Sequence, residues 1–183
     1  QIRDSTQFRS YNKLIPSLDA FTGATIVICD DDTYYWSTWL GELVSEASTS
    51  KGAIICHRTH LIRLLPTGKP TSYRDWKHNT SDCFPSPLAF PTGVGGILIP
   101  PGALDPMVLD TTVARSICPT ADDVWIYWMG RRAGTLFRKI GPVRKFISWR
   151  SSQNVALWRE NNIGEIANDR QIAAMIAHFG SDG

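Results

Sequence analysis

The order of apolar and polar positions along the chain predicts a protein in which strands alternate with helices. Residues 24–29 form a continuous apolar run rich in β-branched side chains, which is typical of a strand buried on both faces in a mainly parallel sheet. This run stops abruptly at Asp30, Asp31 and Asp32. Residues 36–47 then predict an amphipathic helix, because their large apolar side chains recur at helical spacing on one side. That side consists of Trp36, Trp39, Leu40, Leu43 and Val44.

The same alternation continues to the end of the chain. Helices are predicted over residues 11–21, 122–133 and 165–179, strands over 52–56 and 97–99, and two further short strands within 137–149. Thr120 is expected to cap the helix that starts at Asp122, and Gly134 to end it. Residues 65–91 form a long polar segment with enough aromatic side chains to pack as an ordered loop. We therefore expect one α/β domain covering residues 1–183.

Composition narrows the classes of function. The 183 residues are 43% hydrophobic and 20% charged, which is ordinary for a globular protein. A net charge of +2, spread over scattered basic residues, argues against a nucleic-acid binder. The four cysteines form no C-x-x-C pair, so we expect free, buried thiols in a reducing compartment. No apolar stretch approaches the roughly 20 residues that cross a bilayer, and we expect a cytoplasmic protein that can also lie at a membrane surface.

The acidic turn is the first candidate for chemistry. Asp30, Asp31 and Asp32 follow a predicted buried strand directly, and carboxylates this close raise one another's pKa unless a cation neutralises them. A divalent metal ion is a natural partner, since ligands of open α/β sheets bind beyond the carboxyl ends of strands and Mg²⁺ and Mn²⁺ prefer oxygen ligands. An equally good interpretation is that these acids cap the following helix.

Two later motifs can complete such a site. Residues 92–96 read Thr-Gly-Val-Gly-Gly before a predicted strand, and glycines this dense let the backbone approach a ligand or another segment closely, or simply form a tight turn. Asp122 and Asp123 lie in the first turn of a predicted helix. One of them could act as a general base, although helix-capping acids are the ordinary alternative.

Further polar and aromatic residues also allow a functional and a structural interpretation. Trp76 and its neighbours in the long segment suit a flap that binds an acceptor, because aromatic faces stack on sugar rings, but they also suit a packed surface loop. His57 and His60 follow a predicted strand, and we expect them to satisfy backbone hydrogen bonds rather than bind a metal ion.

Three motifs in order carry a resemblance to a known family. ICDDDTYY at residues 28–35, TGVGGILIPPG at 92–102 and PTADDVW at 119–125 resemble the GT-A glycosyltransferases, most closely bacterial enzymes of polysaccharide and capsule gene clusters and more distantly the fringe and β-galactosyltransferase group. SYNKLIP at 10–16 and CHRTH at 56–60 also resemble those bacterial proteins, so the similarity spans nearly the whole chain. It implies a three-layer α/β sandwich with a mixed, mainly parallel sheet, incomplete at its N-terminal, nucleotide-binding part.

The resemblance also implies roles for individual residues. Asp30 and Asp32 match the outer acids of an Asp-x-Asp motif that holds Mn²⁺ or Mg²⁺, with Asp32 as the more direct ligand. Asp123 matches the presumed catalytic base, with Asp122 beside it. The remaining residues expected to bind the donor or another substrate are Asp30, Asp31, Arg58, Trp76, Gly95 and Gly96.

The function that these expectations define is glycosyl transfer. We expect a metal-dependent, inverting enzyme that moves a sugar from a nucleotide-sugar donor to a hydroxyl group of a glycan or glycolipid acceptor, in polysaccharide or glycoconjugate synthesis. The alternative is a non-catalytic remnant of the fold that binds a carbohydrate or another partner. Absent donor-side strands would leave an apolar sheet edge or face exposed, so self-association is expected as well.

Overall fold

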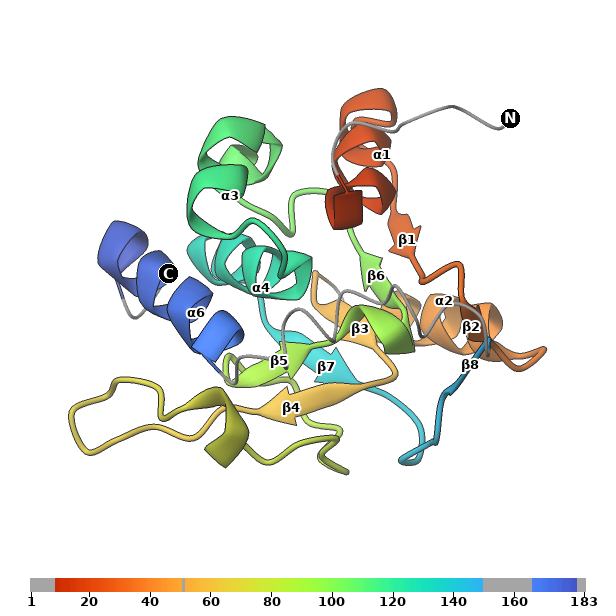
Figure 1. The fold of residues 1–183 in the computed structure, drawn as a ribbon. Helices are drawn as coiled ribbons and strands as arrows, with labels where there is room; N and C mark the ends of the chain where they lie inside the picture. Colours follow the sequence, from red (N-terminus) through yellow and green to blue (C-terminus); the bar gives the residue numbers. More distant parts are fainter. Residues whose placement is uncertain (1–8, 51, 150–165, 181–183) are drawn as a thin grey trace.

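The computed structural model describes residues 9–50, 52–149 and 166–180 (Figure 1). Its helices and 3-10 turns are η1 (Arg9–Lys13), α1 (Ile15–Ala20), α2 (Trp39–Thr49), η2 (Tyr73–Asp75), η3 (Gly93–Gly95), η4 (Pro106–Leu109), α3 (Thr111–Ile117), α4 (Asp122–Arg132) and α6 (Ile166–Phe179). Its strands are β1 (Ile26–Ile28), β2 (Thr33–Tyr34), β3 (Ile54–Cys56), β4 (Thr59–Leu61), β5 (Ala89–Pro91), β6 (Ile97–Ile99), β7 (Phe137–Lys139) and β8 (Ile147–Ser148). The predicted mixture of helices and strands is confirmed.

A four-stranded sheet with the strand order β1-β6-β3-β7 forms the centre of the described structure. β6 pairs antiparallel with both β1 and β3, whereas β3 and β7 pair in parallel. The sheet is therefore mixed and partly parallel, and the expectation of a mainly parallel sheet is wrong. An apolar, β-branched run indicates that a strand is buried, but it does not determine whether the strand pairs in parallel or antiparallel. β1 is such a strand, and it pairs antiparallel with β6 at one end of the sheet.

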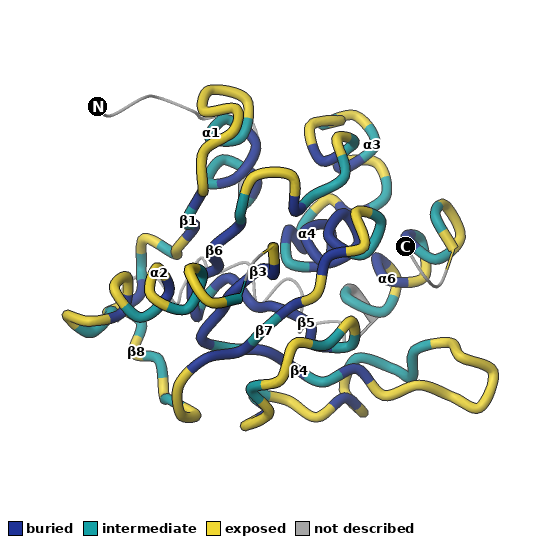
Figure 2. The backbone as a smooth tube through the Cα atoms, turned by 180° about the vertical axis from the view of Figure 1, so that it is seen from behind, coloured by how far each residue is buried: buried dark blue, intermediate teal, exposed yellow. Residues whose placement is uncertain are grey.

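Helices cover both faces of this sheet. Ile97 and Ile99 of β6 belong to a large core cluster that includes residues of α1, α4 and α6, whereas Leu98 belongs to a second cluster with Trp39 and Leu43 of α2. This division follows from the strand geometry, because successive side chains point to opposite faces. Figure 2 shows the buried backbone concentrated in the central strands and the inner part of α4. The central sheet thus lies between helices, as in a layered α/β domain.

The predicted helix at the acidic pair is confirmed, but its cap differs. α4 begins at Asp122 and is followed by Gly134, whose φ of +71° is the left-handed conformation typical of a helix end. The N-cap position is occupied by Ala121, which makes no side-chain capping bond, so the expectation that Thr120 caps this helix is wrong.

The predicted helix over residues 36–47 begins later than expected and buries a narrower stripe. α2 starts at Trp39, and its buried residues are Trp39 and Leu43. Leu40 and Val44, which were predicted to share that stripe, are about half exposed at 48% and 54%. The helix therefore contacts the sheet through one row of side chains, and the adjacent row faces outward.

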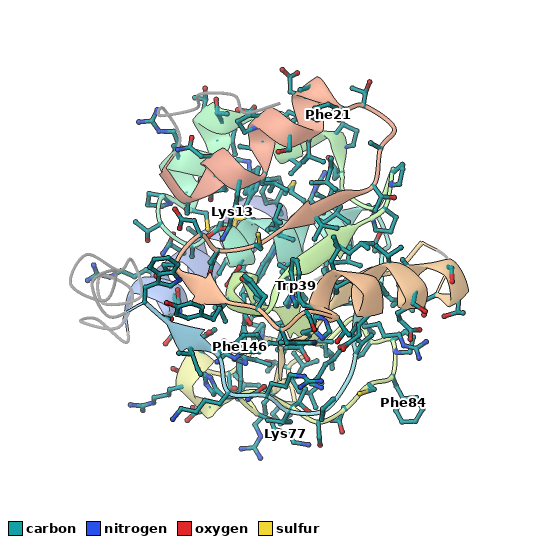
Figure 3. The ribbon with its side chains drawn as sticks, turned by 90° about the vertical axis from the view of Figure 1, so that its right-hand side faces the viewer. Lys13, Phe21, Trp39, Lys77, Phe84 and Phe146 are labelled. Atoms are coloured by element: carbon teal, nitrogen blue, oxygen red, sulfur yellow. The ribbon has the colours of Figure 1, made fainter. Side chains whose placement is uncertain are left out.

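The long segment over residues 65–91 is ordered, as predicted, because its aromatic residues pack. Trp76 and Phe90 are buried in the main core, and β5 within the segment pairs antiparallel with β4. Phe84, in contrast, is 85% exposed and lies at the periphery of the molecule (Figure 3). The thiols were only partly predicted: all four cysteines are free, but Cys29 is exposed and Cys83 is half-buried.

Candidate active site

Three motifs that are far apart in the sequence meet at one edge of the central sheet. Asp30 follows the end of β1, the Gly93 turn precedes β6, and Asp122 and Asp123 open α4. β6 runs antiparallel to β1, so the start of β6 and the end of β1 lie at the same edge. The sequence predicted each motif separately, and the fold brings the three together.

Lys13 supplies the positive charge at this meeting point. Its Nζ lies 2.6 Å from Oδ1 of Asp30 and 3.1 Å from Oδ2 of Asp122. Lys13 ends η1, and its side chain is 24% exposed. The acidic turn was expected to need a cation, and in this structure a lysine ammonium provides one for Asp30.

Gly93 fits this site because it has no side chain. Its backbone N–H donates a hydrogen bond of 2.8 Å to Oδ1 of Asp123. A Cβ atom at position 93 would lie 2.9 Å from Nζ of Lys13 and 3.1 Å from Oδ1 of Asp123. A larger residue would therefore push apart the two groups that face each other across this turn.

The two carboxyl groups at the start of α4 have strongly shifted pKa values. Burial, reinforced by the negative charge of Asp122, raises the pKa of Asp123 to about 8, against the opposing effect of Lys13. Burial also raises the pKa of Asp122, although the Lys13 ammonium counteracts it. Burial alone would lower the pKa of Lys13, but Asp122 and Asp30 together raise it above its usual value. Asp123 is therefore a carboxyl group that can exchange its proton near neutral pH.

Asp31 and Asp32 lie on the outer part of the acidic turn. Asp31 is exposed, and Asp32 is half-buried. Oδ1 of Asp32 accepts a hydrogen bond of 3.4 Å from the Thr33 hydroxyl, and its carbonyl oxygen accepts one of 2.9 Å from the Trp149 N–H. Neither of these acids forms an ion pair with Lys13, which pairs with Asp30 and Asp122 instead.

The fit of a metal ion to this turn can be judged from the carboxylates. Within the described ranges, no three or more His, Cys, Asp or Glu side chains are arranged to hold a metal ion. Asp30 and Asp32 would thus offer one or two carboxylates rather than a closed cage, which is the set that Mg²⁺ commonly uses when substrate phosphates complete its coordination. Asp30 already pairs with Lys13, so Asp32 is the acid of this pair that makes no ion pair with the lysine.

Gly95 and Gly96 have packing roles in the structure. A Cβ atom on Gly96, which has a φ of +81°, would lie 2.2 Å from the Trp39 ring, and one on Gly95 would lie 2.7 Å from Cβ of Arg58. The Trp39 indole N–H donates a hydrogen bond of 2.9 Å to the Gly95 carbonyl. Of the three uses expected for these glycines, the geometry accounts for the close approach of another chain segment, and the positive φ of Gly96 also fits a tight turn.

Trp76 lies away from the ligand-accessible surface. It is 3% exposed, and its indole N–H donates to the Thr71 carbonyl at 3.1 Å. Its ring packs against Tyr73 and Phe90 at centroid distances of 4.9 and 5.2 Å. These contacts correspond to the packed-loop alternative for this residue.

The two histidines make the backbone contacts expected of them. Nε2 of His57 lies 3.1 Å from the Trp39 carbonyl, and Nδ1 of His60 accepts a hydrogen bond of 3.0 Å from the Asn79 N–H. Burial lowers the pKa of His60 to about 3, so this ring is neutral at physiological pH.

Gln171 of α6 holds the start of α4 and was missed by sequence reasoning. Its Oε1 accepts hydrogen bonds from the backbone N–H groups of Thr120 and Ala121 at 3.0 and 3.1 Å, and its Nε2 donates to the Thr120 hydroxyl at 3.0 Å. This side chain bonds backbone groups just before the helix, where Thr120 was expected to cap. No local signal could have revealed it, because the two segments are about 50 residues apart.

We expect Gln171→Ala to destabilise the protein by about 1–3 kcal/mol, since two backbone N–H groups in this half-buried region would lose their acceptor. Urea denaturation followed by tryptophan fluorescence measures this change. Arg170→Ala, at the exposed neighbouring position, is the matched control and should leave the midpoint unchanged. Equal midpoints for Gln171→Ala and the wild type would show that the hydrogen bonds of Gln171 do not stabilise the start of α4.

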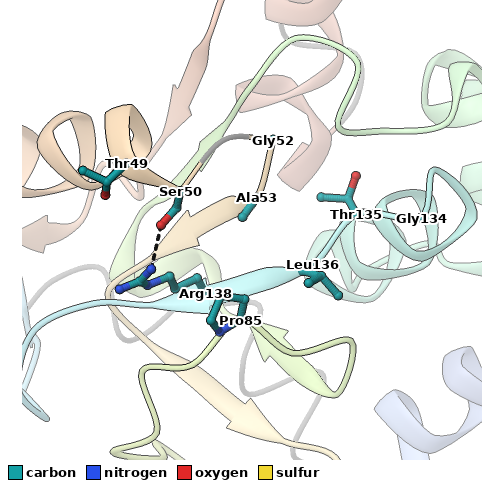
Figure 4. Close-up of a pocket in the computed structure, with 9 residues that line it drawn as sticks. All are labelled: Thr49, Ser50, Gly52, Ala53, Pro85, Gly134, Thr135, Leu136 and Arg138. Carbon is teal, nitrogen blue, oxygen red and sulfur yellow. Dashed lines mark hydrogen bonds between the residues drawn. The ribbon is translucent and has the colours of Figure 1, made fainter.

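A surface pocket of about 530 Å³ lies at the opposite end of β3 from the acidic site (Figure 4). It is lined by residues before β3 and around the start of β7, and Arg138 donates a hydrogen bond of 2.8 Å to the Ser50 hydroxyl within it. Arg138 also pairs with Glu46 at 3.2 Å, so its charge is already balanced within the fold. None of the predicted site residues lines this pocket.

Neither the described helices nor the comparisons with known proteins assign the chain to an environment or a family. In the part of the chain that the structure describes, no helix combines the length and apolar character needed to cross a membrane. The comparisons with family models, curated proteins and solved structures gave no match to this chain. The candidate site is therefore assigned from its own geometry.

Proposed function

We propose that the chain is a GT-A type glycosyltransferase and that its reaction takes place at the meeting point of the acidic turn, the Gly93 turn and the start of α4. The observation that supports this best is the convergence of Asp30, Gly93 and Asp123 on Lys13, with the exposed Asp31 and the half-buried Asp32 on the same turn. Such an edge of an α/β sheet is where ligands commonly bind. A metal ion bound at Asp30 and Asp32 would supply positive charge to the leaving diphosphate.

Asp123 is the proposed general base. Its Oδ1 is held by the Gly93 N–H, which leaves Oδ2 to take the proton of the acceptor hydroxyl. As that proton moves to Oδ2, the acceptor oxygen forms a bond to the anomeric carbon of the donor sugar. The bond from this carbon to the diphosphate oxygen breaks, and its electron pair leaves with the diphosphate. One direct displacement of this kind inverts the anomeric configuration and needs no covalent enzyme intermediate.

Lys13 and Asp122 position this base. The ammonium pairs with Asp122 and Asp30 on one side of the site, and the buried pair restricts where the start of α4 can lie. Gln171 restrains the same segment from α6. Holding a catalytic group in its reactive geometry reduces the entropic part of the barrier.

One observation favours a second candidate, a non-catalytic protein that binds a carbohydrate or another partner. Lys13 already forms ion pairs with two of the acids, Asp30 and Asp122, within the fold. If those ion pairs serve stability alone, the site would bind ligands without transferring sugar. Incubation of the protein with Mn²⁺ and a panel of nucleotide sugars, followed by detection of released nucleoside diphosphate and glycosylated acceptor by mass spectrometry, distinguishes the two candidates.

We expect Asp32→Ala to abolish the Mn²⁺-dependent part of nucleoside diphosphate binding, because the half-buried carboxylate is proposed to link the protein to the metal ion. Calorimetric titration of the nucleoside diphosphate with and without Mn²⁺ measures this difference. Asp19→Ala, the control, removes an exposed carboxylate from α1 and should keep the Mn²⁺-dependent part of the binding. An unchanged Mn²⁺ effect in Asp32→Ala would rule out this carboxylate as the metal ligand.

A further inference from the structure

Arg58 is a positively charged residue at the edge of the candidate site whose charge is only weakly compensated. It follows the end of β3 and is half-buried. Its guanidinium donates one hydrogen bond of 3.2 Å, from Nη1 to the Thr92 hydroxyl. Among the residues that the structure describes, no carboxylate forms an ion pair with it. Most of its five N–H donors are therefore left for another partner.

The surrounding backbone holds Arg58 in a defined place. The Thr92 N–H donates a hydrogen bond of 3.2 Å to the Arg58 carbonyl. Gly95 lies so close to this segment that a Cβ atom at position 95 would be 2.8 Å from the backbone nitrogen of Arg58. The Thr92 hydroxyl then fixes the guanidinium from the same side. The stem of this side chain is thus anchored between β3 and the glycine turn.

Arg58 also lies within electrostatic reach of the proposed base. Burial lowers the pKa of Arg58, and the Asp123 carboxylate, when ionised, opposes this effect. Thr92, whose hydroxyl holds the Arg58 guanidinium, directly precedes Gly93, whose N–H holds Oδ1 of Asp123, so adjacent residues of the glycine turn bind the two side chains.

We propose that Arg58 binds an anionic group of the substrate, a phosphate or a carboxylate, next to Asp123. A guanidinium presents a planar set of donors that matches both groups in a bidentate manner. A half-buried guanidinium without a carboxylate partner gains from such a ligand, because the ligand replaces the water lost on burial. The role of this contact in catalysis rests on the proposed glycosyl transfer, whereas the binding itself does not.

The test measures binding and transfer separately. Inorganic pyrophosphate is titrated calorimetrically into the wild type, Arg58→Met and Arg58→Lys. We expect about 10–100-fold weaker binding in Arg58→Met, the loss typical of a charge-assisted contact, and an intermediate loss in Arg58→Lys, which keeps the charge without the planar fork. Arg63→Met, at an exposed position in the following loop, is the matched control and should bind as the wild type does. Thermal melting checks that each variant is folded.

Two further titrations identify the source of the anion. Weakened binding of a nucleoside diphosphate assigns Arg58 to the donor, and weakened binding of glucuronate, with glucose as the neutral reference, assigns it to an acidic acceptor. Equal pyrophosphate affinity in wild type and a folded Arg58→Met would overturn the proposal, as would failure of the wild type to bind pyrophosphate at millimolar concentration. Loss of pyrophosphate binding in Arg58→Met together with a wild type inactive on all nucleotide sugars would retain the anion site and reject the transferase.

Discussion

Asp123→Asn is expected to lower the rate of sugar transfer by roughly two to four orders of magnitude while leaving donor binding in place. Asparagine keeps the size of the side chain and its Oδ1, which can still accept the 2.8 Å hydrogen bond from the Gly93 N–H. It cannot take a proton from the acceptor hydroxyl. Transfer assays with saturating donor measure the loss, and calorimetry measures donor affinity in the same variant.

The pH dependence gives this variant a second readout. Because the pKa of Asp123 is about 8, kcat/KM of the wild type should rise with pH up to about 8 and then level off, and this rise should be absent from the residual activity of the variant. The groups whose charges set this pKa are Asp122, Lys13 and Asp30. A wild-type profile that is flat between pH 6 and 9, with normal transfer by Asp123→Asn, would assign the residue a structural role.

Asp123→Asn is expected to stabilise the fold at alkaline pH although it slows sugar transfer. A carboxyl group whose pKa is higher in the folded state than in the unfolded state contributes stability below the unfolded pKa, and this contribution is lost as pH rises through the folded pKa. For Asp123 that window runs from about pH 4 to pH 8. At pH 8–9, Asp123→Asn should therefore melt at least about 2–4 °C above the wild type, the shift that 1 kcal/mol produces in a domain of this size.

Asp123→Asn also removes a negative charge from the N-terminus of α4, and this loss of stability is smaller than the gain. Loss of a favourable carboxylate–dipole contact costs about 0.3–1 kcal/mol, whereas a carboxyl group with a pKa near 8 is strongly destabilised in its ionised form. Asp19→Asn, on the exposed face of α1, is the control for removal of one negative charge. A lower melting temperature for Asp123→Asn at pH 9 would show that the helix cap dominates.

Local patterns predicted much of the fold. The helices near residues 122 and 165 and the strand at Ile97–Ile99 were predicted closely, because each combines a strong apolar pattern with clear end signals. The pairing of strands was not predictable in this way, since β1 and β3 both pair with β6, which lies much later in the chain. α3 was not predicted because its seven residues carry few apolar side chains. Asp110, which caps its N-terminus, was the one local signal for this helix.

The acidic residues of the site were predictable because each stands at the end of an element. Asp30 follows a strand and Asp123 opens a helix, and those positions could be read from the pattern around them. Lys13 could not be identified, since a lysine near the start of a predicted amphipathic helix is ordinarily solvated and only the tertiary fold brings it to Asp30 and Asp122. The packing roles of Gly95 and Trp76 equally depend on segments distant in sequence.

Lys13→Met is expected to be the most destabilising substitution in the site, at about 3–5 kcal/mol near pH 8, because it removes one partner of a largely buried charge cluster. The ammonium lies 2.6 Å from Asp30 and 3.1 Å from Asp122. Oδ2 of Asp122 is buried and accepts no well-aligned hydrogen bond in the described structure, so its negative charge depends on that ion pair. Methionine retains the apolar stem, and the loss therefore reports the charge rather than the packing.

The stability lost in Lys13→Met should depend on pH and on the presence of the Asp122 carboxylate. Without the ammonium, the pKa of Asp122 rises further above its usual value, so the destabilisation should shrink as pH falls from 8 to 5 and the carboxyl groups take up protons. Lys13→Met combined with Asp122→Asn should recover part of the stability, because the double variant no longer leaves an unpaired charge at Asp122. Urea denaturation at pH 5 and pH 8 measures all four proteins of this cycle. Additive losses that are equal at both pH values would show that Lys13 does not neutralise the acidic cluster.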